Sequence, residues 1–420
     1  MLYSYLSIHI LNILDMNSKT IFSWLFILSS CALLAIGRVY EERLFIYNVN
    51  LAILISIIYL VLVCFLLFSI NRIVLSRTKF LFYLFYIVLF LTTCILWVVF
   101  DLTDFGFENF FNFWAILVPI SVVIIEKYRM KDVLNTFYVL LVVCCFLAFL
   151  SVIGLSVSER ADGRTATLGG GPIVFARWMG FGILTLFLLP SRLKKWYKYP
   201  LIITFFILAI SSGSRGPILS LLMTGIVYLL INFNRIFVKG MFLIGLLSII
   251  VLFFNIDKKI SKIGNSDRVF MNISKTGGST QSTSTRKNLV IGSFSILKKY
   301  PLGVGPGNWQ IMANKIQPHH LMPLEYPHNL FLEIACEYGL HSLFLFLILL
   351  LYVIPLSYNR MQKYLKDKTS LYPLLFYLMV FLFLNSMVSG MLNDSRLLFI
   401  VISFILINKP LIASQHVNNL

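Results

Sequence analysis

The amino-acid sequence predicts an all-α polytopic membrane protein with about twelve transmembrane helices, and three observations support this fold class. Of the 420 residues, 59% are hydrophobic and 12% are charged, whereas about a quarter of the residues in a soluble domain are charged. Apolar runs long enough to cross a hydrocarbon layer of ~30 Å as helices recur along the whole chain. Basic residues are concentrated in the short segments between these runs. The excess of apolar residues therefore requires contact with lipid.

The predicted helices are the apolar runs between polar segments. The first run has no small-residue cleavage site after it and leads into another span, so we expect a retained helix and not a removable signal peptide. The seventh and twelfth runs are short, which is typical of tilted or half-buried segments. In order, the runs cover residues 20–37, 44–70, 80–100, 110–125, 133–153, 172–190, 200–211, 217–233, 240–255, 339–357, 371–391 and 397–408.

Lys and Arg are distributed unevenly between the two sets of short connections. With the N-terminus placed in the cytoplasm, the connections on the cytoplasmic side contain 18 basic residues and those on the external side contain 6. Such an excess marks the cytoplasmic side, and long translocated loops are exempt from the rule. We therefore expect both termini in the cytoplasm and two longer external segments, residues 154–171 and 256–338.

The segment 256–338 divides one integrated membrane domain into residues 1–255, with nine predicted helices, and residues 339–420, with three. A loop of this length without function is uncommon. Its middle, KTGGSTQSTST (residues 275–285), is predicted to be flexible because Gly, Ser and Thr dominate it.

A short amphipathic helix is predicted in the second half of this external segment. Apolar residues recur at helical spacing from Arg286 to Tyr300. Ser284 or Thr285 would cap the helix, and Pro301 would end it. The turn-rich stretch PLGVGPGNW follows.

The net charge of +18 does not indicate a nucleic-acid partner, because the basic residues form no stripe interleaved with aromatic residues. The cysteines lack CxxC spacing and lie in or beside apolar runs, so we expect small apolar fillers and not disulfides or metal ligands. They are Cys31, Cys64, Cys94, Cys144, Cys145 and Cys336.

Arg215 is the first candidate for chemistry, in the tight turn SSGSRGP between two predicted helices. A planar guanidinium at the mouth of a helix pair, beside Gly and Ser amides, suits a phosphate or diphosphate group. The alternatives are an interfacial anchor or an ion pair with a carboxylate such as Asp394.

Other external arginines are weaker candidates from the sequence alone. Arg286 would open the amphipathic helix, where a cation opposes the helix dipole, and a solvated loop charge is the favoured explanation from these residues alone. Arg177 lies inside a predicted span, and an intramembrane arginine is by default a functional candidate unless it snorkels or forms a pair. Arg160 shares its loop with two acidic residues, which favours a solvated role.

His328 lies directly before the tenth predicted span, in EYPHNLFLEIACEYGL. Pro327 is expected to start a helix and to place the imidazole at its N-terminus. A neutral imidazole there can accept a proton from an attacking hydroxyl, whereas a capping or packing role is the alternative. His319, His320 and Glu325 lie nearby, but the spacing is a poor match to a zinc site.

Three segments in a fixed order resemble the O-antigen ligase/polymerase membrane family. They are SGSRGP, then TRKNLVIGSFSILKKYPLGVGPGNW, and then YPHNLFLEIACEYGLHSLFLF. The resemblance covers about residues 200–350, and the first half of the chain is similar only in being a set of spans.

The resemblance implies an inner-membrane glycosyltransferase of twelve helices with a helical periplasmic region, similar in fold to lipid-phosphate-dependent (GT-C-like) enzymes. Such enzymes use no metal and no cofactor. The donor would be a glycan on undecaprenyl diphosphate, and the acceptor another glycan or lipid A-core. By motif, Arg215 and Arg286 would hold the diphosphate and His328 would serve the acceptor hydroxyl. Arg177, Arg160 and Asn329 are further candidates for binding the substrate.

The family contains polymerases, which join repeat units, and ligases, which transfer a finished glycan to lipid A-core. Arg160 followed by ten residues and Gly171 resembles a spacing of polymerase periplasmic loops, as does the YPHN form around His328. We therefore expect a polymerase, with a ligase as the alternative and a chain-length regulator as a possible partner. A transporter or flippase is less favoured, because such proteins tend to show two similar halves.

Overall fold

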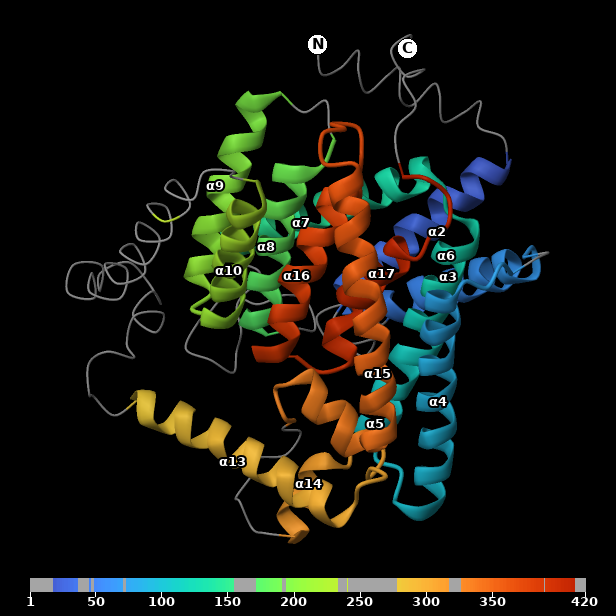
Figure 1. Ribbon diagram of the computed structural model, residues 1–420, viewed down its shortest axis with the longest axis vertical. Coiled ribbons are helices and arrows are strands. Elements are labelled where there is room, and N and C mark those ends of the chain that lie inside the picture. The colour runs from blue at the N-terminus through green and yellow to red at the C-terminus, as the bar shows by residue number, and fades with distance from the viewer. Residues whose placement is uncertain are drawn as a thin grey trace.

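The computed structural model describes residues 18–36, 45–46, 49–70, 73–154, 171–190, 194–232, 240, 278–316, 326–388 and 390–411, and all structural statements here concern these residues. They form a bundle of long helices, with α13 (Gly278–Lys299) and α14 (Trp309–Ile316) across one end (Figure 1).

The other helices cover the predicted apolar runs, but α5 begins before the run 110–125 and α15 begins nine residues before the run 339–357. In the first half they are α2 (Ser18–Ala35), α3 (Leu51–Phe68), α4 (Arg77–Val99), α5 (Asp104–Phe111), α6 (Val118–Lys127) and α7 (Met130–Val152). In the second half they are α8 (Pro172–Leu188), α9 (Lys195–Ser211), α10 (Arg215–Asn232), α15 (Leu330–Lys363), α16 (Tyr372–Val388) and α17 (Arg396–Ile405). The ninth predicted run, residues 240–255, lies outside the described residues apart from residue 240.

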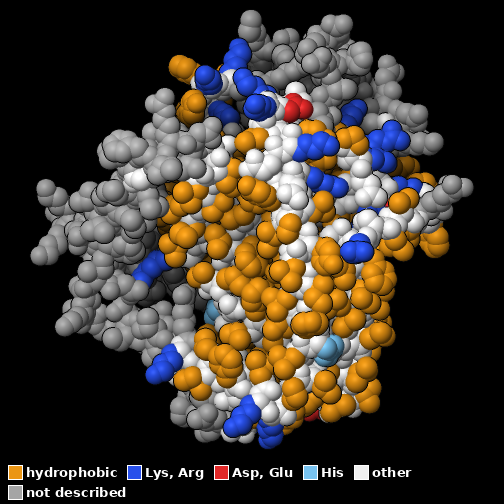
Figure 2. Space-filling model, in the orientation of Figure 1, with side chains coloured by type: hydrophobic (Ala, Val, Ile, Leu, Met, Phe, Trp, Pro, Cys, Tyr) orange, Lys and Arg blue, Asp and Glu red, His pale blue; other side chains and the backbone are white. Residues whose placement is uncertain are grey.

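The chain is a polytopic α-helical membrane protein. Within the described part, six helical segments are long and apolar enough to cross a membrane: α3, α4, the continuous segment Asp104–Lys127, α7, α10 and α15. Large apolar side chains on these helices are exposed, such as Val61 at 65%, Val142 at 66% and Leu351 at 72%. Figure 2 shows such side chains as a broad band across the visible face. An apolar surface of this extent is stable only against lipid.

The prediction of a span from residue 44 was wrong at its start. Residues Phe45–Ile46 (β1) and Val49–Asn50 (β2) form a small antiparallel pair, and the helix begins at Leu51. The side chain of Asn50 accepts hydrogen bonds from the backbone N–H groups of Ala52 and Ile53 at 2.9 and 3.3 Å. An asparagine that caps the first turn in this way fixes where the helix starts.

The prediction for the external helix was also wrong at its start. Helix α13 begins at Gly278, so the stretch that was expected to be flexible is helical from that residue onward. Arg286 therefore lies two turns inside the helix and does not open it. The helix ends at Lys299, close to the predicted end at Pro301.

One span contains a wider turn. Between α5 and α6, residues Asn112–Leu117 form the π-helix η2, and the three elements continue without a break. The side chain of Thr103 caps α5 by accepting a hydrogen bond from the N–H of Gly106 at 3.0 Å. A π-turn inserts an extra residue and shifts the side chains that follow.

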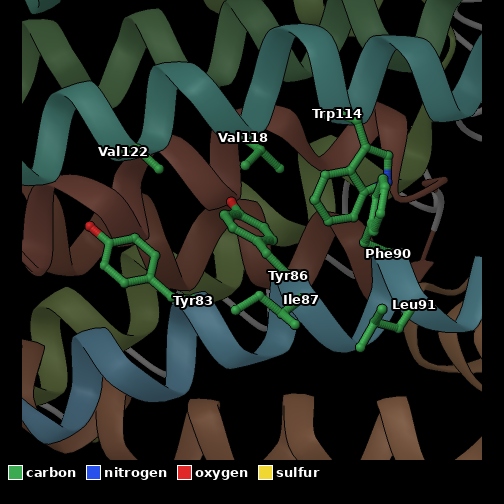
Figure 3. Close-up of a pocket in the computed structure, with 8 residues that line it drawn as sticks. All are labelled: Tyr83, Tyr86, Ile87, Phe90, Leu91, Trp114, Val118 and Val122. Atoms are coloured by element: carbon green, nitrogen blue, oxygen red, sulfur yellow. The ribbon is translucent and has the colours of Figure 1, made fainter. Parts of the chain in front are cut away.

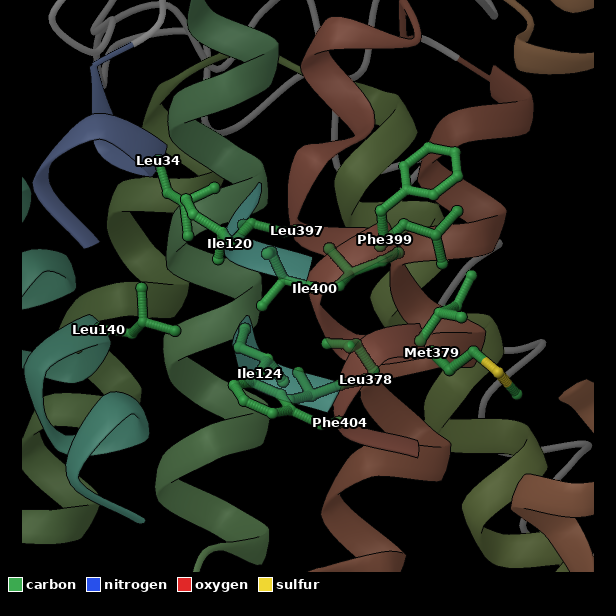
Figure 4. Close-up of a cluster of buried hydrophobic side chains, with 14 of the residues drawn as sticks. Leu34, Ile120, Ile124, Leu140, Leu378, Met379, Leu397, Phe399, Ile400 and Phe404 are labelled. Carbon is green, nitrogen blue, oxygen red and sulfur yellow. The ribbon is translucent and has the colours of Figure 1, made fainter. Parts of the chain in front are cut away.

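The main core lies where α2, α6, α7, α16 and α17 meet (Figure 4). Every residue of α17 from Arg396 to Ile405 is buried, as expected for a helix that is apolar all round. Its ten residues cover ~15 Å, which is half of the hydrocarbon layer. Helix α17 is therefore a central packing element and too short to span alone.

Most helices of the bundle alternate in direction with the helix before them, so their described ends lie on two sides of the bundle. The ends of α4, α7, α9 and α16 and the starts of α5, α8, α10 and α17 lie on the side that faces α13 and α14 (Figure 1). The ends of α6, α8 and α15 and the starts of α7, α9 and α16 lie on the other side. This arrangement brings the start of α10, with Arg215, to the same end as the start of α15, which follows His328.

A second, smaller core attaches α13 and α14 to α15. It consists of Leu289, Ile296, Val304, Trp309, Met312, Ala313 and Cys336. The indole N–H of Trp309 donates to the hydroxyl of Ser293 at 3.1 Å, and the thiol of Cys336 donates to the carbonyl of Ser293 at 3.4 Å. These contacts fix the C-terminal half of α13 on the first turns of α15.

Candidate functional site

Arg215 is the first residue of α10 and follows a tight turn. Gly213 has a φ of 67°, which glycine adopts without strain. The N–H of Ser214 donates to the hydroxyl of Ser212 at 3.2 Å. A Cβ built on Gly216 would lie 3.3 Å from Cγ1 of Val388, so the start of α10 packs closely on the end of α16.

The position of Arg215 suits an anion. The first N–H groups of an 18-residue helix have no partner within the helix and carry partial positive charge. A half-buried guanidinium at the same point adds a full charge and a planar pair of donors. The start of α10 is therefore a candidate site for a phosphate or diphosphate.

His328 does not lie at a helix N-terminus as expected, because α15 begins two residues later, at Leu330. His328 has a φ of 54°, the one left-handed non-glycine residue among those described. Its half-buried ring lies 4.1 Å from the ring of Tyr326, measured between centroids. A backbone outlier of this kind costs energy, and such outliers gather at functional sites.

Asn329 is the residue that caps α15. Its side-chain oxygen accepts hydrogen bonds from the N–H groups of Phe331 and Leu332 at 3.0 and 3.1 Å. Its amide group donates to the carbonyl of Met387 at 2.9 Å. Both the oxygen and the amide group of the Asn329 side chain are therefore hydrogen-bonded, and they hold the residue after His328 beside α16. A direct role for Asn329 in binding substrate stays a prediction.

Arg177 is buried in the second turn of α8. One terminal N–H group of its guanidinium donates to the carbonyl of Asp394. A Cβ built on Gly390 would lie 3.4 Å from the other terminal nitrogen, so the guanidinium packs against the backbone after α16. The contact makes Arg177 a positioning residue for this segment, and its proposed contact with substrate stays untested.

The connection between α16 and α17 is the structural centre of the site. Val388 meets the start of α10, Met387 bonds to Asn329, and Gly390 packs on Arg177. These three contact points lie within three residues of one another, which is at most ~11 Å of chain. Arg177 itself, and the residues that directly follow Arg215 and His328, therefore contact one short segment.

Two buried glutamates are part of the site and were not among the candidates from the sequence. Glu333 and Glu337, one turn apart in α15, are 4% and 5% exposed. Glu333 accepts a hydrogen bond from the N–H of Leu392 at 2.8 Å, and Glu337 accepts one from the N–H of Gly307 at 3.0 Å. Two acids four residues apart in an otherwise apolar stretch were the available signal, since buried carboxylates need such partners.

A break in α15 receives the glycine-rich stretch that follows α13. Gly339 has a φ of 86° and interrupts the helix. The N–H of Leu340 donates to the carbonyl of Pro301, and the N–H groups of Val304 and Gly305 donate to the carbonyls of Cys336 and Glu337. The backbone groups that the break leaves without partners in the helix thus form hydrogen bonds with residues 301–305.

Close packing explains the glycines of this stretch. Gly303 has a φ of 98°, and a Cβ there would lie 2.7 Å from the carbonyl oxygen of Glu337. Gly307 has a φ of 76°, and a Cβ there would lie 2.5 Å from the backbone of Gly106 at the start of α5. Larger residues do not fit at either position.

The side chain of Arg286 is outside the described residues, although its backbone lies in α13. Ser293, seven residues later and ~10 Å along the helix, is bonded to Trp309 and Cys336. The helix that carries Arg286 is therefore fixed to the helix that follows His328. Arg160, His319, His320 and Glu325 lie outside the described residues.

Comparison with known proteins gives one finding. Residues 200–347 match a family model described as O-antigen ligase. The match includes Arg215, Arg286, Asn329 and His328, and it confirms the resemblance seen in the sequence. No curated protein matches the chain. Residues 200–347 therefore contain the O-antigen ligase domain, which supports a membrane protein of the O-antigen ligase/polymerase family.

Proposed function

We propose that this protein polymerises glycan repeat units carried on undecaprenyl diphosphate, at the external face of the bacterial inner membrane. One observation supports this most directly. The region that matches the family contains both Arg215 and His328. Gly216, which follows Arg215, and Asn329, which follows His328, both contact the end of α16. A cation for the leaving group and a base for the acceptor are thereby held on one segment.

The proposed reaction is a single glycosyl transfer. The acceptor hydroxyl oxygen attacks the anomeric carbon of the donor, the bond from that carbon to the diphosphate oxygen breaks, and the hydroxyl proton passes to the imidazole of His328. Arg215 and Arg286 neutralise the charge that develops on the departing diphosphate. Fixed guanidinium groups supply this charge, so the proposal includes no metal and no cofactor.

The architecture and orientation are also proposed. We infer about twelve membrane helices in a GT-C-like arrangement, with both termini in the cytoplasm and residues 256–338 in the periplasm. The excess of basic residues in the short connections supports this orientation. The membrane domain would consist of residues 1–255 and 339–420 around the periplasmic segment.

The second candidate is an O-antigen ligase that transfers the glycan to lipid A-core. The matching family model is described as O-antigen ligase and is compatible with both functions. The YPHN form around His328 and the spacing from Arg160 to Gly171 favour the polymerase. A polymerase would work with a chain-length regulator, and a ligase would not need one.

The test is the lipopolysaccharide of a strain in which the gene is deleted. We expect core that carries one repeat unit, which identifies a lost polymerase. Bare core with accumulated lipid-linked polymer would identify a ligase instead. Re-expression of Arg215→Ala at the normal protein level should not restore the ladder, whereas Lys368→Ala, an exposed basic residue at the opposite end, should restore it fully. An unchanged ladder in the deletion strain contradicts both functions.

A further inference from the structure

A groove lies between α4 and the segment that contains η2 and α6, at the surface of the bundle. Its cavity volume is about 450 Å³. Figure 3 shows aromatic and branched side chains directed into it from the two helices. The lining consists of Tyr83, Tyr86, Ile87, Phe90, Leu91, Trp114, Val118 and Val122.

The π-helix contributes the largest side chain to this groove. Trp114 comes from η2, and its ring packs edge-on against Phe90 at 5.0 Å and Tyr86 at 6.2 Å, measured between centroids. A π-turn displaces side chains from the positions of a regular helix. Trp114 therefore lies in the widened turn, and its indole ring forms one wall of the groove.

The groove is open to the surface that faces lipid. Ile87 is 54% exposed and Leu91 is 53% exposed, and both line it. Both helices are long and apolar enough to cross the membrane. An apolar cavity in this position excludes water and accepts a hydrocarbon chain.

One end of the groove is polar and basic. The hydroxyl of Tyr83 donates to Glu126 at 2.8 Å, and Lys79 forms an ion pair with the same carboxylate oxygen at 3.1 Å. Five basic residues and two acidic ones lie at this end of α4, α6 and α7: Arg77, Lys79, Lys127, Arg129 and Lys131 against Glu126 and Asp132. Arg77, Arg129 and Lys131 are exposed. The excess of positive charge is complementary to an anionic headgroup.

The length of the groove indicates which lipid it fits. From Tyr83 to Leu91 the helix rises by ~12 Å, which is less than half of the ~30 Å hydrocarbon layer. This length matches part of an acyl chain within one leaflet, whereas a polyprenyl chain is far longer. The basic end is opposite the end that holds Arg215 and His328, so this groove is separate from the candidate active site (Figure 1).

We propose that the groove binds one anionic phospholipid, with an acyl chain against Trp114 and the phosphate near Arg77, Arg129 and Lys131. In the proposed orientation the lipid belongs to the cytoplasmic leaflet. Binding of this lipid does not depend on the proposed glycosyl transfer.

Native mass spectrometry of the full-length protein tests the proposal, after reconstitution in vesicles of dioleoyl phosphatidylglycerol or dioleoyl phosphatidylcholine. The wild type should retain one phosphatidylglycerol per chain. The double variant Ile87→Trp/Leu91→Trp fills the groove and should lose it. The matched control Ile95→Trp/Val99→Trp, at exposed sites on the same helix with the same spacing, should keep it.

The headgroup contacts have a separate readout. Arg77→Gln and Lys131→Gln should each reduce the preference for phosphatidylglycerol over phosphatidylcholine by about fivefold. Equal lipid retention in the filled and control variants overturns the proposal. A dimer mass that disappears in the filled variant also overturns it and makes the groove an interface between two copies. Retention of a polyprenyl lipid in place of phosphatidylglycerol excludes the proposed ligand.

A second measurement covers the case in which the filled variant does not accumulate. Phosphatidylglycerol with brominated acyl chains quenches tryptophan fluorescence on contact. Comparison of the wild type with Trp114→Phe should show that Trp114 accounts for a quenched component. Equal fractional quenching in both proteins means that no chain lies against Trp114.

Discussion

The carboxylate of Glu337 accepts a hydrogen bond from the N–H of Gly307 at 3.0 Å, while the backbone carbonyl of the same glutamate accepts one from the N–H of Gly305 at 2.9 Å. A single residue of α15 thus holds the glycine-rich stretch by its side chain and its main chain. The stretch connects α13, which carries Arg286, to α14. Glu337 therefore helps to hold α13, which carries Arg286, against the helix that follows His328.

Removal of the Glu337 side-chain acceptor should destabilise the contact between the glycine-rich stretch and α15. Glu337→Leu leaves the N–H of Gly307 without its partner, and we expect a loss of ~1–3 kcal/mol in the free energy of unfolding. Glu337→Gln keeps an acceptor oxygen and should remain close to the wild type. Thermal unfolding of the purified protein in detergent measures the difference. Equal melting temperatures for the two variants would show that the hydrogen bond is not structural.

Substitution of His328 separates its backbone role from its chemical role. His328→Gly accommodates a φ of 54° without strain, so we expect normal folding and a loss of glycan transfer of ~10²–10⁴-fold. His328→Val should lose both stability and transfer, because a β-branched residue resists this conformation. Transfer from a purified lipid-linked donor and thermal unfolding are the two readouts. Substantial transfer by His328→Gly would remove the imidazole from the mechanism.

Substitution of Arg177 distinguishes positioning from direct substrate binding. Arg177→Met removes the donor to the carbonyl of Asp394, and we expect the melting temperature and the transfer rate to fall together. If Arg177 instead binds the diphosphate, the KM for the donor should rise while the melting temperature stays unchanged. Arg177→Lys serves as the conservative comparison, since lysine keeps the charge without the planar fork.

Two glycines in different surroundings give a matched pair. Gly339→Ala places a Cβ 2.4 Å from the carbonyl oxygen of Leu302 and forces alanine to a φ of 86°, so we expect destabilisation of at least ~1–2 kcal/mol. Gly225→Ala, within α10, meets nothing within 4 Å and should stabilise by ~0.5–1 kcal/mol. Chemical unfolding of both variants provides the comparison. A neutral Gly339→Ala would mean that the break in α15 is not required.

The sequence predicted the membrane helices well because their length and polarity are set by the lipid layer. Their starts were less predictable, since a single hydrogen-bonded side chain decides them. Asn50 caps α3 and moved its start by several residues. Helix α13 extends back to Gly278 through residues of low helix propensity, so propensity alone does not predict where it starts.

The residues of the candidate site could be proposed from the sequence where a motif marks them, but the contacts between distant segments could not. Arg215 and His328 stood out because charged or titratable side chains are rare beside apolar runs. The role of the α16–α17 connection could not be read from the sequence, because its contacts with Arg177, Gly216 and Asn329 join positions far apart in the chain.

The break at Gly339 also bears on the order of events during biogenesis. Its released peptide groups bond to residues 301–305, which leave the ribosome before α15 does. In hydrocarbon an unsatisfied peptide group costs several kcal/mol of free energy. Newly made α15 alone is therefore most stable as an unbroken helix. In the proposed orientation, the bend can form only after the upstream segment has been exported to the same face. Completion of the candidate site is then a late step of maturation, and faulty export of that segment would leave a protein that is inserted but inactive.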